Sequence, residues 1–363
     1  MRKGMKFRLY PTEEQKQQLC KLFGSMRYVY NKAVEVYLEA KVNKMSYPTY
    51  NELKTMLYYH KKTENGKFLQ EIDPIALTIS LRNFSLALNS YLKGEKQEPS
   101  FKTKYGNQSI TFMNKGQIRY DDQFFYLPQL GALQYVKTLD FDNINAITIS
   151  KNRCDQYFVS INTSFQQIKL PKSKNVVGID VGINVFCTTS NGAVIENPRY
   201  YEKQIKKLAR EQKRLSGMQK GGKNYGKQCK KIAKIHLNIK NQRENFLHNL
   251  STKLIRENQI ICVEKLDIKS MLKNHDLAKS ISSVSWSTFF GMLEYKAKFY
   301  GRKIIKVNTY FPSSQTCSCC GYQNKQLKDL NIRFWVCPEC KSEHDRDLNA
   351  SINIRDKGLT QIK

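Results

Sequence analysis

The sequence contains no apolar run long enough to cross a membrane, since no window approaches the ~18 apolar residues that a spanning helix needs. Its first residues, MRKGMKFRLYPTEEQ, carry charges but no apolar core, so they are not a secretory signal peptide. Only five of the 363 residues are histidine, and no Ser/His/Asp or Cys/His set stands out for nucleophilic catalysis. We therefore expect a cytoplasmic protein without a membrane partner, in which clustered cysteines are reduced and bind metal.

Acidic residues are few compared with basic ones. The 31 Asp and Glu residues stand against 61 Lys and Arg residues, for a formal net charge of +30. Such an excess costs self-repulsion in the compact state, so it favours a polyanionic partner over a merely basic surface. At 363 residues, the chain is also too long for one simple domain.

Hydrophobic periodicity changes twice along the chain. An alternating strand at 5–10 precedes helical periodicity that runs to about residue 93, and Thr12 with Gln15 forms a capping-box signature at its start. A basic linker follows at 94–108. Short alternating segments between residues 109 and 162 then predict a small antiparallel β-barrel, which the first strand would join.

After residue 175 the predicted elements follow an α/β order. A β-meander turns at Asn191-Gly192, and a long helical stretch at 200–257 is broken at Gly221-Gly222. A buried strand at 260–264, an amphipathic helix at 286–300 and a strand at 303–308 complete this region.

Two of these strands carry a carboxylate near their carboxyl end. Apolar side chains alternate with Asp180 in VVGIDV and with Glu264 in IICVE. Two such strands side by side would bring the carboxylates together, which is tolerable only when a cation lies between them. Hard oxygen ligands favour Mg²⁺ or Mn²⁺, and two ions ~3.5–4 Å apart would activate water and stabilise the leaving oxygen of a phosphodiester.

A third acidic ligand is expected at the start of the last helix, in EHDRDLNASINI. We expect Asp347 to supply it, but His344 and Asp345 compete for roles there, and Asp345 resembles an N-cap. A single acid at a strand end is more often a turn or capping residue. The joint occurrence of three acids is what indicates a site.

Four cysteines form the strongest metal signature. Cys317-x2-Cys320 and Cys337-x2-Cys340, separated by sixteen residues, match the spacing of a structural four-thiolate Zn²⁺ site. Cys319, next to Cys320, falls outside the x2 spacing, so we interpret it as a bystander.

The helical stretch after residue 199 is strongly basic, with Glu202 and Glu211 as its acids up to residue 243. A solvated helix face normally mixes charge signs, whereas this one is predicted to lack internal compensation and to contact phosphates. The candidate nucleic-acid-binding residues are Lys203, Lys206, Lys207, Arg210, Lys213, Arg214, Lys223, Lys227, Lys230, Lys231 and Lys234.

Together these segments resemble one family. GIDVGINVFCTTSNG, ICVEKLDIKSM, the run from FPSSQTCSCCG to WVCPECKSEHDRDLNASINI and the opening KFRLYPTEEQ look like TnpB, the transposon-encoded OrfB protein related to type V CRISPR effectors. The resemblance covers essentially the whole chain. It implies an RNA-guided DNA endonuclease of prokaryotic, nucleoid-associated location, with guide RNA and target DNA as partners.

The resemblance also implies a domain plan and roles for residues. A wedge-like β-barrel would span 1–10 and 105–170, a helical recognition insertion 11–104, a RuvC-like (RNase H-like) nuclease 172–308 and 342–363, and a zinc ribbon 309–341. Asp180, Glu264 and Asp347 match the catalytic acids, which decides for Asp347 over Asp345. Cys317, Cys320, Cys337 and Cys340 match the zinc ligands.

We therefore expect an α/β protein with a small β-barrel and a helical insertion, whose Mg²⁺ site hydrolyses DNA under RNA guidance. Two alternatives are a nuclease-inactive RNA-guided repressor, against which the three acids argue, and a strand-joining transposase, which the same acids would serve. A zinc-ribbon RNA-binding protein would explain the cysteines and the charge but not the carboxylates.

Overall fold

The computed structural model describes residues 2–114, 116, 118–164, 168–273, 275–329 and 331–362; at 2, 3, 142, 164, 269 and 275–277 only the backbone is described. The chain divides into two compact units, Met1–Gln166 and Gln167–Lys363, which are described separately. No helix in the described ranges is long and apolar enough to span a bilayer.

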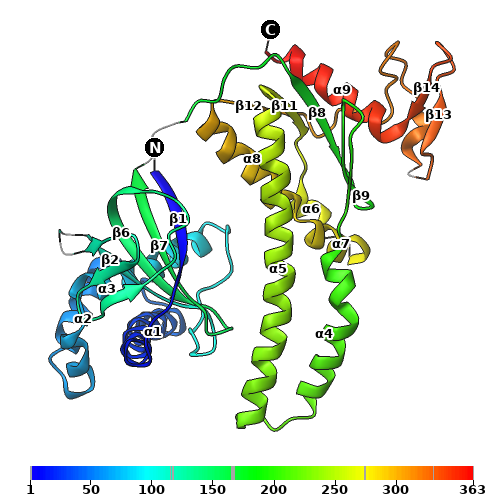
Figure 1. The fold of residues 1–363 in the computed structure, drawn as a ribbon. Coiled ribbons are helices and arrows are strands. Elements are labelled where there is room, and N and C mark those ends of the chain that lie inside the picture. Colours follow the sequence, from blue (N-terminus) through cyan, green and yellow to red (C-terminus); the bar gives the residue numbers. More distant parts are fainter. Residues whose placement is uncertain are drawn as a thin grey trace. The chain divides into compact units, whose positions relative to one another are not determined.

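The first unit combines helices with antiparallel sheets (Figure 1). Its helices are α1 (Glu13–Val42), α2 (Tyr50–His60), the 3-10 helix η1 (Glu64–Glu71) and α3 (Pro74–Leu92). The predicted capping box is confirmed: the Thr12 hydroxyl accepts from the Gln15 amide at 3.3 Å, and the Gln15 side chain accepts from the Thr12 amide at 3.0 Å.

Two antiparallel sheets follow the predicted alternation. One has the order β1-β7-β6-β2 and the other the order β3-β4-β5. Their strands are β1 (Arg2–Leu9), β2 (Gln108–Met113), β3 (Arg119–Tyr120), β4 (Phe124–Leu127), β5 (Gly131–Gln134), β6 (Asp142–Lys151) and β7 (Tyr157–Ser164). The first strand does pair across the helical insertion, with β7. Strand β5 was not predicted.

The second unit is built on a five-stranded sheet of order β10-β9-β8-β11-β12. The strands are β8 (Val176–Val181), β9 (Val185–Thr189), β10 (Val194–Glu196), β11 (Ile260–Glu264) and β12 (Lys303–Val307). The predicted meander is confirmed, since β8, β9 and β10 are antiparallel, and Gly192 takes the positive φ of 84° that its turn needs. By contrast, β8, β11 and β12 are parallel neighbours.

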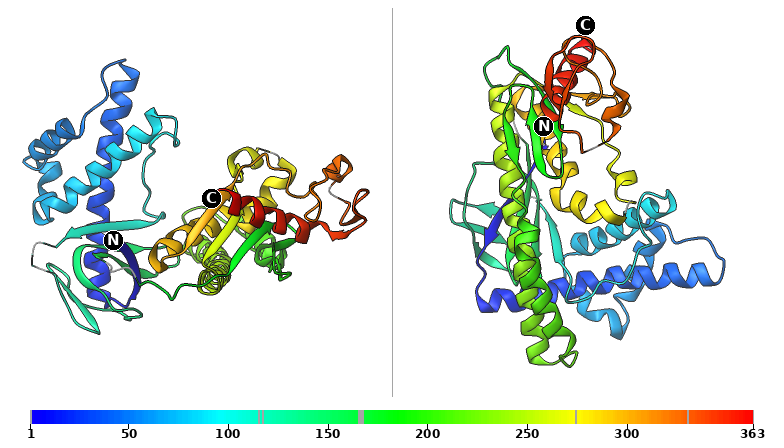
Figure 2. Two further views of the ribbon diagram at one scale, coloured as in Figure 1. Left: turned by 90° about the horizontal axis from the view of Figure 1, so that it is seen from above. Right: turned by 90° about the vertical axis from the view of Figure 1, so that its right-hand side faces the viewer.

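Helices cover both faces of this sheet (Figure 1 and Figure 2). On one face, apolar residues of β8 and β11 pack in one core with α5 (Lys223–Glu257) and α8 (Trp286–Tyr300). On the other face lies α9 (Arg346–Thr360). It approaches closely because Gly178 has no side chain: a Cβ there would lie 2.0 Å from the carbonyl oxygen of Ser351.

The remaining elements branch from this α/β core. Helix α4 (Tyr200–Ser216) packs along α5, and the predicted break at Gly221-Gly222 lies in the turn between them. Short helices α6 (Ile268–Met271) and α7 (His275–Val284) precede α8. The cysteine-bearing segment contains the 3-10 helix η2 (Lys325–Lys328) and the hairpin β13 (Phe334–Val336) and β14 (Glu343–Asp345).

Candidate active site and zinc ribbon

Asp180 and Glu264 lie on neighbouring parallel strands. Val263 of β11 pairs with Ile179 of β8, so the two carboxylates follow one position later on each strand. Both Val263 and Ile179 belong to the core beneath α5 and α8, so strand alternation turns Asp180 and Glu264 to the opposite face, on the side of α9. They are also near the carboxyl ends of parallel strands, where α/β sheets place ligands.

His344, Asp345 and Asp347, the three candidates for the third ligand, have different surroundings near the N-terminus of α9. The Asp345 carboxylate caps the helix by accepting from the Leu348 amide at 2.8 Å. His344 is buried, and its Nε2 lies 3.1 Å from the Cys317 sulfur, in the cysteine cluster. Asp347 lies in the first turn of α9 and acts electrostatically on Asp180. Of the three, Asp347 is the one whose charge acts on a strand carboxylate.

Burial and neighbouring charges act on the strand carboxylates. Burial, followed by the charges of Glu264 and Asp347, raises the pKa of Asp180 well above its usual range, against the opposing charge of Arg346. Burial also raises the pKa of Glu264, although the Ser313 hydroxyl donates a hydrogen bond to it. Acids in such surroundings hold their charge only when a cation lies beside them.

The three acids are nevertheless spread more widely than the ligands of a single ion. In the described ranges, the groups whose ligand atoms all lie within 4.8 Å of one another are formed by cysteines and His344, not by these carboxylates. Asp347 is paired instead with Arg333, whose Nη1 donates to its carboxylate at 3.1 Å.

Sequence reasoning missed the three polar residues that contact or influence these acids. Ser313 is buried and holds Glu264, and Arg333 pairs with Asp347. Arg346 is buried, and its Nη1 donates to the carbonyl oxygens of Asp329 and Ile332 at 2.6 and 3.4 Å. Their positions depend on how the cysteine-bearing segment folds back on α9, and no periodic pattern in the sequence signals that.

The two cysteine pairs form matching knuckles. The Cys317 amide donates to the carbonyl of Tyr322 at 2.8 Å, and the Cys337 amide donates to that of Ser342 at 2.9 Å. In each knuckle the residue four positions after the first cysteine, Gly321 or Lys341, has a positive φ and donates its amide to that cysteine's carbonyl.

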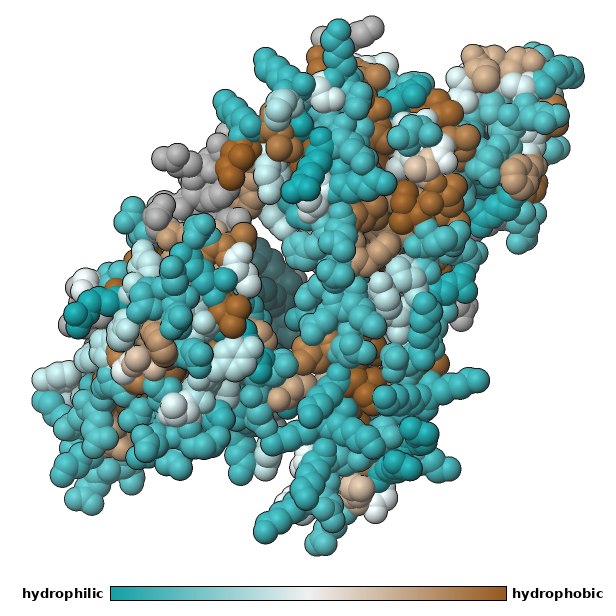
Figure 3. All heavy atoms as spheres, viewed as in Figure 1, coloured by the Kyte–Doolittle hydropathy of each residue, from teal (hydrophilic) through white to brown (hydrophobic). Residues whose placement is uncertain are grey.

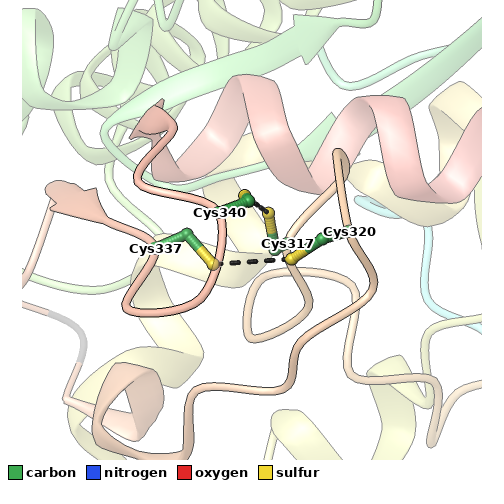
Figure 4. Close-up of side chains that lie close together, drawn as sticks. All are labelled: Cys317, Cys320, Cys337 and Cys340. Atoms are coloured by element: carbon green, nitrogen blue, oxygen red, sulfur yellow. Dashed lines mark hydrogen bonds between the residues drawn. The ribbon is translucent and has the colours of Figure 1, made fainter.

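The knuckles turn all four sulfur atoms toward one another (Figure 4). Cys317 and Cys340 are separated by 3.6 Å between sulfurs, as are Cys320 and Cys337. Four thiolates around one Zn²⁺ at ~2.3 Å lie about 3.8 Å apart, so this donor set fits zinc. The predicted cluster is thus brought together as a candidate zinc ribbon.

Cys319 is closer to this cluster than its interpretation as a bystander implied. Together with Cys317 and His344, it forms a second group whose ligand atoms lie within 4.8 Å of one another. Although burial opposes it, hydrogen bonds from the Cys320 amide, the Ser342 hydroxyl and other donors lower the pKa of Cys317 to about 5. Cys317 therefore belongs to both groups of candidate ligands.

The eleven cations predicted to bind nucleic acid all lie on α4 and α5 and are all exposed. The prediction that their charge has no internal compensation is wrong for Glu211. This residue is fully buried between the helices, and Arg210, Arg214 and Lys231 each place a nitrogen within 3.5 Å of its carboxylate. The sequence pattern shows one acid among many bases, but not that the acid points inward.

Comparisons with known proteins show which families and proteins this chain resembles. Three family models match: "Probable transposase" (OrfB_IS605) over residues 156–275, "Cas12f1-like, TNB domain" over 286–354, and "Helix-turn-helix domain" (HTH_OrfB_IS605) over 1–40. A Streptomyces pristinaespiralis protein named "Putative RNA-guided DNA endonuclease" is 33% identical over 99% of this chain and 90% of its own length. "TnpB-like protein L79" of Acanthamoeba polyphaga mimivirus is 24% identical over 98% of this chain and 73% of its own.

Among solved structures, the fold resembles the protein in "Cryo-EM structure of the Cas12f1-sgRNA-target DNA complex". The TM-score is 0.58 at 13% sequence identity, covering 98% of each chain. The family resemblance seen in the sequence agrees with the family models and with the relative that matches over 90% of its own length. The chain therefore belongs to the TnpB family of transposon-encoded OrfB proteins.

Proposed function

We propose that this protein is an RNA-guided DNA endonuclease that hydrolyses phosphodiesters at Asp180, Glu264 and Asp347 with Mg²⁺ or Mn²⁺. One observation carries the proposal: Asp180 and Glu264 follow paired residues on neighbouring parallel strands, and Asp347, in the first turn of α9, adds its charge to that of Glu264 in raising the pKa of Asp180. The antiparallel-then-parallel order of that sheet supports a RuvC-like, RNase H-like nuclease domain. The relative's name, which states RNA-guided DNA cleavage, supports the choice of substrate.

The carboxylates fit a hard divalent cation. They offer oxygen ligands only, and the burial and neighbouring charges that act on Asp180 favour a positive partner. When bound, such ions supply Lewis-acid stabilisation of the charge that develops on phosphoryl oxygens. In this chain, Ser313 holds Glu264, and the Asp345 cap fixes the helix turn that carries Asp347.

The domain plan proposed for this activity follows the two units. A wedge-like barrel (1–10 and 105–170) with its helical insertion (11–104) would hold the guide–target heteroduplex by its backbone, leaving sequence reading to base pairing. The nuclease (172–308 and 342–363) would cut, with the zinc ribbon (309–341) packed beside Asp347. A nuclease-inactive repressor is disfavoured because all three acids are in place; a strand-joining transposase would instead leave joined products.

The test is cleavage by the protein purified with its own RNA. We expect sequencing of that RNA to find a defined species, and DNA that matches its guide segment to be cut in Mg²⁺ or Mn²⁺. EDTA should stop cutting, and restored Mg²⁺ should restart it. Cutting that persists in EDTA would contradict the metal assignment, and joined products would support the transposase.

Arg333 gives a second prediction. Its guanidinium is half exposed beside Asp347, so it could contact a phosphate bound to a cation that the acids hold. We expect Arg333→Ala to slow cleavage by about 10²-fold at saturating Mg²⁺, the size typical of losing one charge-stabilising group. Lys328→Ala, which removes an exposed ribbon cation, is the control and should cleave like the wild type. An Arg333→Ala rate within threefold of wild type would remove Arg333 from the site.

A further inference from the structure

Helices α4 and α5 form a long hairpin whose contact is unusual in one respect. Its apolar part is small and is centred on Leu208, Ile235 and Ile239. Beyond it, toward the turn, the buried contact is made by the side chains of Glu211 and Gln228. A carboxylate thus lies inside a hairpin whose outer surface is hydrophilic and covered with long side chains (Figure 3).

Glu211 is held by four groups from both helices. Its Oε2 accepts from Gln228 Nε2 at 2.9 Å and lies 3.1 Å from Lys231 Nζ. Its Oε1 lies 3.5 Å from both Arg210 Nε and Arg214 Nη1. The Gln228 side chain also donates to the backbone carbonyl of Glu211 at 2.8 Å, which ties α5 to α4 at this level. Arg210, Arg214 and Lys231 therefore face a counterion within the protein.

A second group of cations lies along one side of α5. Lys223, Lys227 and Lys234 repeat at i, i+4 and i+11, so they form one stripe about 16 Å long on the helix surface. All three are exposed, and α5 contains no Asp or Glu before Glu244. Lys231 lies beside this stripe in sequence but is drawn toward Glu211.

We propose that Glu211 divides the hairpin cations into two groups with different roles. Arg210, Arg214 and Lys231 are neutralised within the protein and hold α4 against α5, whereas the α5 stripe binds the phosphate backbone of nucleic acid. Glu211 is then a positioning residue: it fixes the helix on which the stripe lies. The inference rests on the proposed function only for its choice of nucleic acid as the partner.

Nucleic acid fits the stripe better than other polyanions. A rigid row of cations along one side of a helix matches a partner with regularly repeated charge. The apolar side chains at the α4–α5 contact are used in packing the helices together, so no apolar face remains to enter a lipid surface. Phosphate contacts of this kind are independent of base sequence.

The test separates the two groups by a salt titration of RNA and DNA binding combined with thermal unfolding. We expect the triple variant Lys223→Gln, Lys227→Gln, Lys234→Gln to lose affinity similarly for all sequences. Its log–log salt slope should become shallower by up to roughly 0.9 per lost contact on duplex DNA, or 0.7 on a single strand. Its Tm should stay at the wild-type value or rise, because self-repulsion is relieved.

Lys231→Gln is the matched control, since it removes one lysine from the same helix. We expect its Tm to fall by on the order of 2–4 °C while its salt slope stays at the wild-type value. Glu211→Gln should lower Tm further, because three cations lose their counterion, and its slope should not become shallower. If Lys231→Gln changes the slope as much as a stripe lysine does, or if the triple variant leaves the slope unchanged, the division is wrong.

The pH dependence of Tm supplies a readout that loss of packing alone would not give. The hydrogen bond from Gln228, followed by that from Lys231, lowers the pKa of Glu211 from its ordinary 4.5 to about 2. A lowered folded-state pKa means that the carboxylate stabilises the protein above pH 4.5 and loses this effect as the pH falls toward 2. The Tm gap between wild type and Glu211→Gln should therefore be full at pH 7 and narrow below pH 4.5; a constant gap contradicts the ion cluster.

These outcomes are distinguishable from failure of the proposed function. A wild-type protein that binds nucleic acid but does not cut it would overturn the nuclease and leave the salt-slope comparison intact. A wild-type protein that binds no nucleic acid would overturn the choice of partner as well.

Discussion

Replacing Asp180 by Asn is expected to abolish DNA cleavage while leaving guide RNA and target DNA bound. Asp180 lies beside Glu264 on the neighbouring strand, and the charges of both Glu264 and Asp347 act on it. An amide of the same shape removes the charge that holds a divalent cation. Because metal catalysis contributes several kcal/mol to the transition state, and each 1.4 kcal/mol is tenfold in rate, we expect a loss of roughly 10³-fold or more.

Two aspartates of the same region serve as controls. Asp345→Asn keeps a good N-cap, because Asn accepts the Leu348 amide as Asp does, and cleavage should stay near the wild-type rate. Asp356→Asn lies on the exposed side of α9, paired with Arg355, and should also cleave normally. Gel-shift binding and single-turnover cleavage would be measured on these three variants and on Asp347→Asn. Wild-type cleavage by Asp180→Asn, or a loss in Asp345→Asn equal to that in Asp347→Asn, would contradict the assignment.

Removing zinc is expected to have the second largest effect. The ribbon core consists mainly of Cys317, Leu327, Trp335 and Cys337. A core of this size is too small to fold without a bound metal or a disulfide. Binding of structural zinc is worth about 10–16 kcal/mol at pH 7, so Cys337→Ser should lose the ion and unfold the ribbon locally. Because the ribbon carries Arg333 and leads directly into α9, cleavage should fall with it.

Elemental analysis checks this prediction, with one zinc expected per wild-type chain. Cys319→Ser is the matched control: it lies in the other knuckle, between Cys317 and Cys320, and should retain both zinc and cleavage. Active protein without zinc would refute the site. A Cys319→Ser variant that loses zinc while Cys320→Ser retains it would mean that Cys319 is the ligand.

Much of this fold could be predicted from local patterns in the sequence. The capping box at Thr12, the Asn191-Gly192 turn, and the apolar strands that bear Asp180 and Glu264 are all set by residues close in sequence. That the two strands are parallel neighbours follows from the α/β order of elements. Strand β5 was missed because its four residues, GALQ, are too few to show a period.

The contacts that were not predicted depend on packing between residues far apart in the sequence. Ser313 contacts Glu264 across a separation of 49 residues, and His344 contacts Cys317 across 27. Glu211 was counted as one acid on a basic face, because helical periodicity places it but does not report which neighbour it will meet. Such contacts follow from how the elements pack together, and one sequence does not encode that packing in a readable period.

Exchange of the guide is the measurement that tests the central claim most directly. The protein would be reconstituted in Mg²⁺ with its RNA carrying a new guide segment of about 20 nucleotides. It would be offered two DNAs that differ only in whether they match the old or the new guide. An RNA-guided endonuclease cuts the DNA that matches the new guide and leaves the other intact, and Asp180→Asn cuts neither. Cleavage of both DNAs alike, or of the old target only, would contradict the account.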